Sequence, residues 1–159
     1  MKAKFLKLCF LSCIIISSMV MLGCATKNNL SSIISYAQKN FKDIDLQKEN
    51  CIFLIGERGC IGCNQAMSRL ATEYLNQDNV YFIINPQSDG RIVDISPYWE
   101  ASNQAHISFD TIDYFNKRQF EYSYAFFIKN NKVDTIINIV AQTYETDVSY
   151  IKNRLKKKE

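Results

Sequence analysis

The sequence predicts an α/β domain that contains both parallel and antiparallel strands. Two short apolar runs, residues 51–55 and 80–84, are separated by a stretch with the periodicity of an amphipathic helix, which predicts a parallel pair. Further along the chain, two apolar stretches flank Asn130-Asn131 and predict a hairpin. About 135 residues remain after removal of a predicted signal peptide, enough for one modest hydrophobic core.

The amino terminus has the pattern of a signal peptide. Lys2, Lys4 and Lys7 precede a nearly continuous apolar run over residues 8–22. This run is shorter than the roughly 18–20 residues that a membrane-spanning helix needs. We therefore interpret residues 1–23 as a cleaved signal peptide rather than a permanent anchor.

Met21-Leu22-Gly23-Cys24 resembles a bacterial lipobox. The resemblance implies cleavage before Cys24 and attachment of lipid to its thiol, with residues 24–29 forming a short polar tether. The expected location is then the bacterial cell envelope, as a membrane-anchored lipoprotein that faces the periplasm or the cell exterior. An uncleaved anchor or ordinary secretory cleavage would instead leave Cys24 unmodified.

Charge gives no indication of nucleic-acid binding. The whole chain has 19 basic and 16 acidic residues, but three of the lysines belong to the predicted signal peptide. The mature chain is therefore close to neutral, and its net charge makes no electrostatic case for a nucleic-acid partner.

Cysteine usage reduces to one pair and one single residue. Cys9 and Cys13 leave with the predicted signal peptide, and Cys24 is the predicted lipid site. Cys51, Cys60 and Cys63 remain, too few for a scaffold of several disulfides.

The first half of the domain is expected to alternate helices and strands. Apolar residues at spacings of three and four predict a helix over residues 30–42. A polar loop precedes the strand at 51–55, and a turn at 56–59 leads into a helix over about residues 60–76. The inward face of that helix is predicted to contain Met67, Leu70, Ala71, Tyr74 and Leu75.

The second half is expected to begin with the strand at 80–84. Both prolines lie in residues 85–97, which predicts mostly loop, with a short extended piece at 91–93. A helix is expected within 108–118, with Phe109, Ile112 and Phe115 inward. The hairpin strands are predicted at 122–129 and 133–140. Thr143 or Thr146 is expected to cap a last helix, with Val148, Ile151 and Leu155 on its inner face.

In this order of elements, residues 30–159 resemble a thioredoxin-like domain, nearest to the small membrane-anchored TlpA/ResA group. The residue-level likeness is concentrated in Gly59-Cys60-Ile61-Gly62-Cys63 and in the hairpin at 126–133. The resemblance implies a mixed central sheet flanked by helices on both faces.

The spacing of Cys60 and Cys63 suits thiol–disulfide exchange. A sulfur at the first turn of a helix meets unpaired backbone N–H groups and the positive end of the helix dipole, which favour its thiolate. We therefore assign Cys60 as the nucleophile and Cys63, one turn further on, as the resolving thiol. Arg58 could add positive charge and Glu57 could oppose it, although both also fit solvated loop positions.

Three residues depart from the thioredoxin pattern. Gly59 stands where the family usually has tryptophan, and Leu54 stands in place of a buried acid. Ser123 falls where the family has a cis-proline before the hairpin, with Tyr122 or Tyr124 there in another register. A residue other than proline is expected to have a trans peptide bond, since the cis form costs roughly 2.5–4 kcal/mol.

Other interpretations of the cysteine pair remain open at this stage. It could be a structural disulfide, or half of a metal site completed by Cys51 and His106, although neither residue has zinc-finger spacing. Cys51 is otherwise expected to be a buried core thiol, and His106 a loop or surface histidine. Trp99 and Tyr98 could face a substrate, but core packing is the simpler expectation.

The sequence therefore favours a lipid-anchored, extracytoplasmic thiol–disulfide oxidoreductase that acts on protein thiols or disulfides and requires no cofactor or metal. The resemblance also implies a membrane electron donor as a partner, if the domain acts as a reductant. The alternative is a non-catalytic thioredoxin-like envelope module that holds a partner and contains a structural disulfide.

Overall fold

The computed structural model describes residues 30–56, 60–85, 94–111, 114–115, 120 and 122–156. The chain divides into two compact units, Met1–Tyr36 and Ala37–Glu159. Residues 30–40 are helical, close to the predicted range of 30–42. The predictions for the signal peptide, for Cys24 and for residues 25–29 lie outside the described residues, as does the extended piece expected at 91–93.

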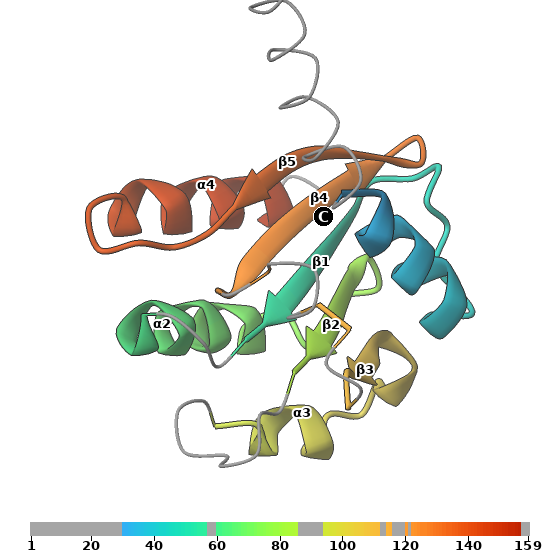
Figure 1. Ribbon diagram of the computed structural model, residues 1–159, viewed down its shortest axis with the longest axis horizontal. Coiled ribbons are helices and arrows are strands. Elements are labelled where there is room, and N and C mark those ends of the chain that lie inside the picture. Colours follow the sequence, from blue (N-terminus) through green and yellow to red (C-terminus); the bar gives the residue numbers. More distant parts are fainter. Residues whose placement is uncertain are drawn as a thin grey trace, which may run out of the picture. The chain divides into compact units, whose positions relative to one another are not determined.

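The second unit is built on a five-stranded mixed sheet in the order β3-β2-β1-β4-β5 (Figure 1). Strand β1 (Asn50–Ile55) pairs in parallel with β2 (Val80–Ile84), as predicted from the apolar runs. Every residue of both strands is buried, which explains why their sequences are continuously apolar after Asn50.

The predicted hairpin is confirmed, with somewhat shorter strands. Strand β4 (Tyr124–Lys129) pairs antiparallel with β1 on one side and with β5 (Lys132–Ile137) on the other. Asn130 and Asn131 connect them with φ angles of 52° and 57°. Asparagine tolerates this left-handed conformation, which a two-residue hairpin turn of the primed type requires.

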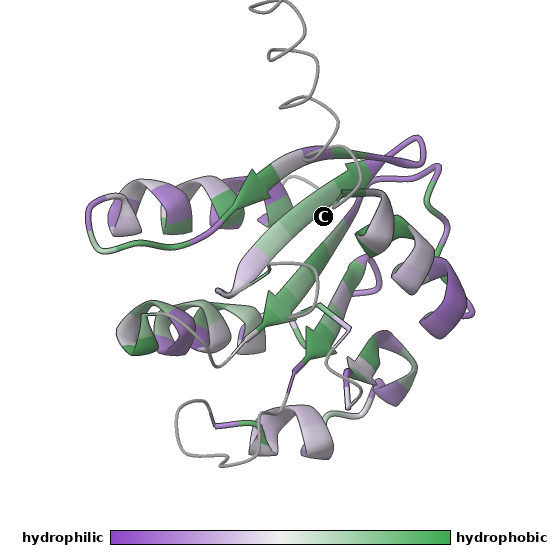
Figure 2. Ribbon diagram, in the orientation of Figure 1, coloured by the Kyte–Doolittle hydropathy of each residue, from purple (hydrophilic) through white to green (hydrophobic). Residues whose placement is uncertain are grey.

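One face of the sheet is covered by α2 (Ile61–Thr72) and α4 (Tyr144–Lys156). Alternate strand residues, such as Phe53, Phe82 and Phe127, point to this face and form a buried cluster with side chains of both helices. Figure 2 shows that the central strands are mostly hydrophobic and that α4 contains both hydrophilic and hydrophobic residues. The predicted inner residues Ile151 and Leu155 are 0% and 3% exposed.

Aromatic rings pack on the opposite face of the sheet. Phe41, just after the helix at 30–40, packs on Tyr81 with ring centroids 5.0 Å apart. Phe120 contacts Phe126 and Phe115 in edge-to-face geometry at 5.7 and 5.8 Å. These ring contacts bury Tyr81 and Phe126, which point away from α2 and α4.

The prediction of a helix within residues 108–118 is wrong for the first residues of that range. Residues Ile107–Phe109 form the edge strand β3, which pairs in parallel with β2. The backbone N–H of Asp110 then donates to the Ile84 carbonyl at 2.7 Å, extending the same pairing. Three alternating residues are too few for the sequence pattern to reveal a strand, and pairing with β2 decides their conformation. Residues 112–113 and 116–119 lie outside the described part of the chain.

The proline-containing segment also includes a helical turn that the sequence analysis did not predict. Helix α3 (Ser96–Glu100) contains Pro97 in its first turn, where the missing N–H of proline has no intrahelical partner to lose. The hydroxyl of the buried Tyr98 donates to the Ser68 carbonyl in α2 at 3.2 Å. This bond attaches α3 to the helix that carries the cysteine pair.

Candidate redox site

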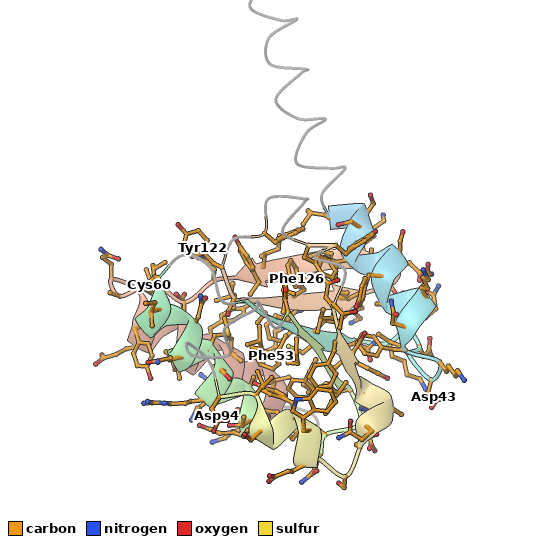
Figure 3. The ribbon with its side chains drawn as sticks, turned by 60° about the horizontal axis from the view of Figure 1, so that its bottom comes forward. Asp43, Phe53, Cys60, Asp94, Tyr122 and Phe126 are labelled. Atoms are coloured by element: carbon orange, nitrogen blue, oxygen red, sulfur yellow. A yellow bond between two sulfur atoms is a disulfide. The ribbon has the colours of Figure 1, made fainter. Side chains whose placement is uncertain are left out.

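Cys60 and Cys63 form a disulfide across the first turn of α2 (Figure 3). Their Cα atoms are 5.2 Å apart, within the range that a disulfide spans. Cys60 is exposed and Cys63 is partly buried. Cys60 is therefore the more accessible of the two residues.

Cys60 is the N-cap residue of α2. Its backbone is extended, with φ −75° and ψ 106°, while its carbonyl already accepts the first helical hydrogen bond from the Asn64 N–H at 3.0 Å. Its Sγ accepts from the Cys63 N–H at 3.3 Å. A backbone donor is thus aimed at the sulfur, and after reduction it would stabilise a negative charge there.

Ser123 contacts the chain on both sides of the cysteine pair. Its Oγ accepts from the Gly56 N–H at 3.0 Å and lies 3.3 Å from the Gly56 carbonyl, to which it donates. Its own N–H donates to Asn64 Oδ1 at 2.9 Å. Ser123 and Asn64 are 3% and 0% exposed. We call this set of three residues, Gly56, Asn64 and Ser123, the Ser123 bridge.

No cis peptide bond occurs among the residues that the structure describes, so Ser123 is trans, as expected. The backbone carbonyl group of Tyr122, the residue before it, lies beside Gly56, since a Cβ built on Gly56 would lie 3.2 Å from its oxygen and 3.4 Å from its carbon. This close approach suits a residue without a side chain.

Two exposed apolar side chains belong to the segments around the disulfide. Ile61, directly after Cys60, is 52% exposed, and Tyr122, next to Ser123, is 36% exposed. Both segments can be followed in Figure 3, where Cys60 and Tyr122 are labelled. Leu54, in the place of the family's buried acid, is 1% exposed within β1. Glu57, Arg58 and Gly59 lie outside the described residues.

The structure does not bring Cys51 or His106 to the disulfide. Cys51 is paired with Val80 at the amino ends of β1 and β2, whereas Cys60 follows the carboxyl end of β1. A strand rises about 3.3 Å per residue, so Cys51 and Gly56 are about 16 Å apart. Cys51 is fully buried and takes no part in a disulfide, as predicted.

The expectation that His106 is a loop or surface residue is wrong. The side chain is only 8% exposed, its ring packs on Tyr81 with centroids 4.3 Å apart, and its Nδ1 lies 3.2 Å from the Val80 carbonyl. Pairing of β3 with β2 places it there, at the same amino-terminal edge of the parallel strands. Among the described residues, no group of three or more His, Cys, Asp or Glu side chains could hold a metal ion.

Tyr98 and Trp99 separate into a core residue and a surface residue. Tyr98 is 0% exposed and its hydroxyl bonds to Ser68, in agreement with the core interpretation. Burial, opposed in part by the Ser68 bond, holds the pKa of Tyr98 above its ordinary value. Trp99 is 59% exposed and stacks on Phe109 of the edge strand, with centroids 3.8 Å apart.

Asn64 is the site residue that sequence analysis missed. It lies three residues before Met67, so extending the predicted inner face of the helix by one turn would have identified it as buried. A buried asparagine needs a partner, and the sequence gives no indication of which residue 59 positions away supplies it.

None of the helices in the described residues combines the length and the apolar character that a membrane span requires. No family model matches the sequence, and no curated protein or solved structure matches it either.

Proposed function

We propose that this chain is a lipid-anchored thiol–disulfide oxidoreductase with a thioredoxin-like fold. The observation that carries the proposal is the Cys60–Cys63 disulfide at the start of α2, with Cys60 exposed as the N-cap. The fold assignment draws support from the strand order, in which the strand before the cysteines is central and lies beside an antiparallel hairpin.

In the reducing direction, the Cys60 thiolate attacks one sulfur of a substrate disulfide and expels the other sulfur as a thiolate. The Cys63 thiolate then attacks Cys60 Sγ in the mixed disulfide. The second substrate sulfur leaves, and the Cys60–Cys63 disulfide forms. Two electrons pass to the substrate, whose two thiolates take up the two protons lost by the cysteines, and the same steps in reverse would oxidise a dithiol.

The surroundings of Cys60 suit a protein substrate. Ile61 and Tyr122 are exposed apolar side chains on the segments that flank the disulfide. Apolar surface beside a reactive sulfur can bury part of an extended chain that carries the substrate cysteine. A donor protein at the membrane would re-reduce the pair if the domain acts as a reductant.

Redox titration and turnover test this proposal. The wild-type protein is expected to reduce a protein disulfide catalytically, and Cys60→Ser is expected to abolish turnover. Cys63→Ser should accumulate a mixed disulfide through Cys60, which mass spectrometry would detect. A reduction potential below about −300 mV together with no turnover would identify a structural disulfide and exclude the enzymatic proposal.

A second function, a non-catalytic envelope module that holds a partner, is favoured by Leu54. A buried leucine replaces the acid that the family resemblance implies, so the carboxylate that could exchange protons with the cysteines is missing at that position. This module would keep the disulfide closed throughout its function. The same titration separates the two proposals, because a binding module needs no accessible dithiol form.

The anchor is tested separately from the chemistry. We expect the protein extracted from membranes to begin at Cys24 and to have the added mass of lipid on that residue. Cys24→Ser should release the protein from the membrane fraction. The ratio of disulfide to dithiol that Cys60 and Cys63 reach in a glutathione buffer should stay unchanged. Recovery of an unmodified Cys24 in the membrane-extracted protein would exclude the lipid anchor.

A further inference from the structure

The Ser123 bridge attaches both sides of the cysteine pair to one buried residue. Gly56 lies four positions before Cys60, and Asn64 directly follows Cys63. Ser123 uses its hydroxyl for Gly56, at 3.0 Å, and its backbone N–H for Asn64 Oδ1, at 2.9 Å. Because the two contacts use different atoms of Ser123, either can be removed while the other remains.

The bridge occupies a position where an unpaired polar group would be costly. Asn64 is 0% exposed and Ser123 is 3% exposed. A buried polar group without a partner is destabilising, so these groups favour the arrangement in which they are bonded. Proline at residue 123 would have no N–H for Asn64. The bond from Ser123 to Asn64 therefore requires a residue other than proline at this position.

We propose that Asn64 and Ser123 are positioning residues that hold the two cysteines at the separation needed for disulfide formation. This proposal rests on the redox function proposed above. Asn64 fixes the first turn of α2 immediately after Cys63, and Ser123 Oγ fixes the end of β1 from which the chain leads to Cys60. When the disulfide is reduced, the hydrogen bonds of the bridge remain and limit how far the thiols can separate.

Holding two thiols close together favours their joint oxidation. Formation of the Cys60–Cys63 disulfide by glutathione disulfide consumes two protein thiols and releases two glutathione thiols. Its equilibrium constant rises with the effective concentration of one protein thiol at the other. Removal of a bond that restrains the dithiol form should therefore make the disulfide easier to reduce.

Asn64→Ala tests the Asn64 side of the bridge, and Ser68→Ala is its matched control. Both residues are buried in α2 and both are hydrogen-bonded, but Ser68 bonds to Tyr98, away from the cysteines. Both variants should lose stability. Only Asn64→Ala should lower the equilibrium constant for disulfide formation with glutathione, by about 5-fold, the factor expected for one net hydrogen bond.

Ser123→Ala tests the Gly56 side, because it removes the hydroxyl and keeps the N–H for Asn64. It should lower the equilibrium constant by at least about 5-fold, because the hydroxyl both accepts from and donates to the Gly56 backbone. It also provides an independent test if Asn64→Ala does not fold. In each case the full chain is equilibrated in glutathione buffers and alkylated. Mass spectrometry of the peptide that contains Cys60 and Cys63 then gives the oxidised fraction.

An equilibrium constant within 2-fold of wild type in the folded variants, as for Ser68→Ala, would overturn the positioning role and leave the bridge as a contribution to stability alone. Failure of the enzymatic proposal would appear differently, as absence of turnover in the wild-type protein. The glutathione equilibrium can be measured in either case, so the two failures are distinguishable.

Discussion

The backbone carbonyl oxygen of Tyr122 lies so close to Gly56 that a Cβ atom on Gly56 would be 3.2 Å from it. The next residue after Tyr122 is Ser123, whose Oγ is hydrogen-bonded to the Gly56 backbone. The end of β1 and the segment before β4 are therefore in direct contact at the start of the chain segment that leads to the cysteines.

Gly56→Ala is expected to lower the free energy of unfolding by roughly 1–3 kcal/mol, because the obstructing atom belongs to the backbone and cannot rotate away. Denaturant unfolding would measure the change. The substitution should also disturb the hydrogen bonds of Ser123 with Gly56. A stability equal to that of the wild type would mean that the Tyr122 segment adapts without cost.

Gly62→Ala should have the opposite effect on stability. A Cβ on Gly62 would meet no atom within 4 Å, and the residue lies in the first turn of α2. Alanine is more favourable than glycine in a helix, so the free energy of unfolding should rise by up to about 0.5–1 kcal/mol. Denaturant unfolding measures this change as well. A loss of stability in Gly62→Ala would show that a Cβ at this position does meet other atoms.

Tyr98→Phe should destabilise the protein at neutral pH by about 1 kcal/mol, because the hydroxyl bonds to Ser68 in the core. Burial raises the pKa of Tyr98 in the folded state, so the folded protein keeps its proton where the unfolded chain loses it. The resulting stabilisation is fully present below the unfolded pKa of about 10 and is lost as the pH rises above it. The fall in stability at alkaline pH should be shallower in Tyr98→Phe, and an unchanged slope would contradict this assignment.

Arg154→Ala tests the attachment of α4 to the sheet. The guanidinium donates to Glu49 at 2.8 Å and to Thr135 at 2.8 Å, and it lies 4.4 Å from the centre of the Phe127 ring. Because the Arg154 side chain is only 20% exposed, its loss should cost about 2 kcal/mol of unfolding free energy.

The matched control for this prediction is Lys152→Ala, two residues earlier in α4. Lys152 pairs with Glu73 at 2.8 Å, but both side chains are more exposed, at 34% and 52%. Solvent screens such a pair, so its removal should lower the free energy of unfolding much less than Arg154→Ala does. Equal losses of unfolding free energy in the two variants would show that the contacts of Arg154 stabilise the fold no more than an exposed ion pair does.

Alkylation should distinguish the thiols of the domain. After mild reduction, Cys60 is expected to react first, because it is exposed at the helix terminus. Cys51 is 0% exposed and should react only when the protein unfolds. Peptide mapping after timed iodoacetamide treatment would measure both rates. Labelling of Cys51 at the rate of Cys60 would show that β1 opens readily.

Local sequence was sufficient to predict the elements that have a strong pattern. The continuous apolar runs predicted β1 and β2, and the Asn130-Asn131 pair predicted the hairpin, because these signals depend on neighbouring residues alone. Strand β3 was mistaken for part of a helix, since three residues show too little periodicity and only their pairing with β2 gives them a strand conformation.

The sequence by itself determined the cysteine spacing, the helix that starts beside Cys60, and the apolar strand that leads to it. Only the tertiary structure decided which polar groups surround that pair. Asn64 and Ser123 are 59 residues apart in the chain, and they meet because β4 pairs with β1 next to α2. Similarly, His106 is buried because β3 lies beside β2. Residue spacing encodes local hydrogen bonds, whereas contacts between distant residues depend on how the strands pair and the helices pack.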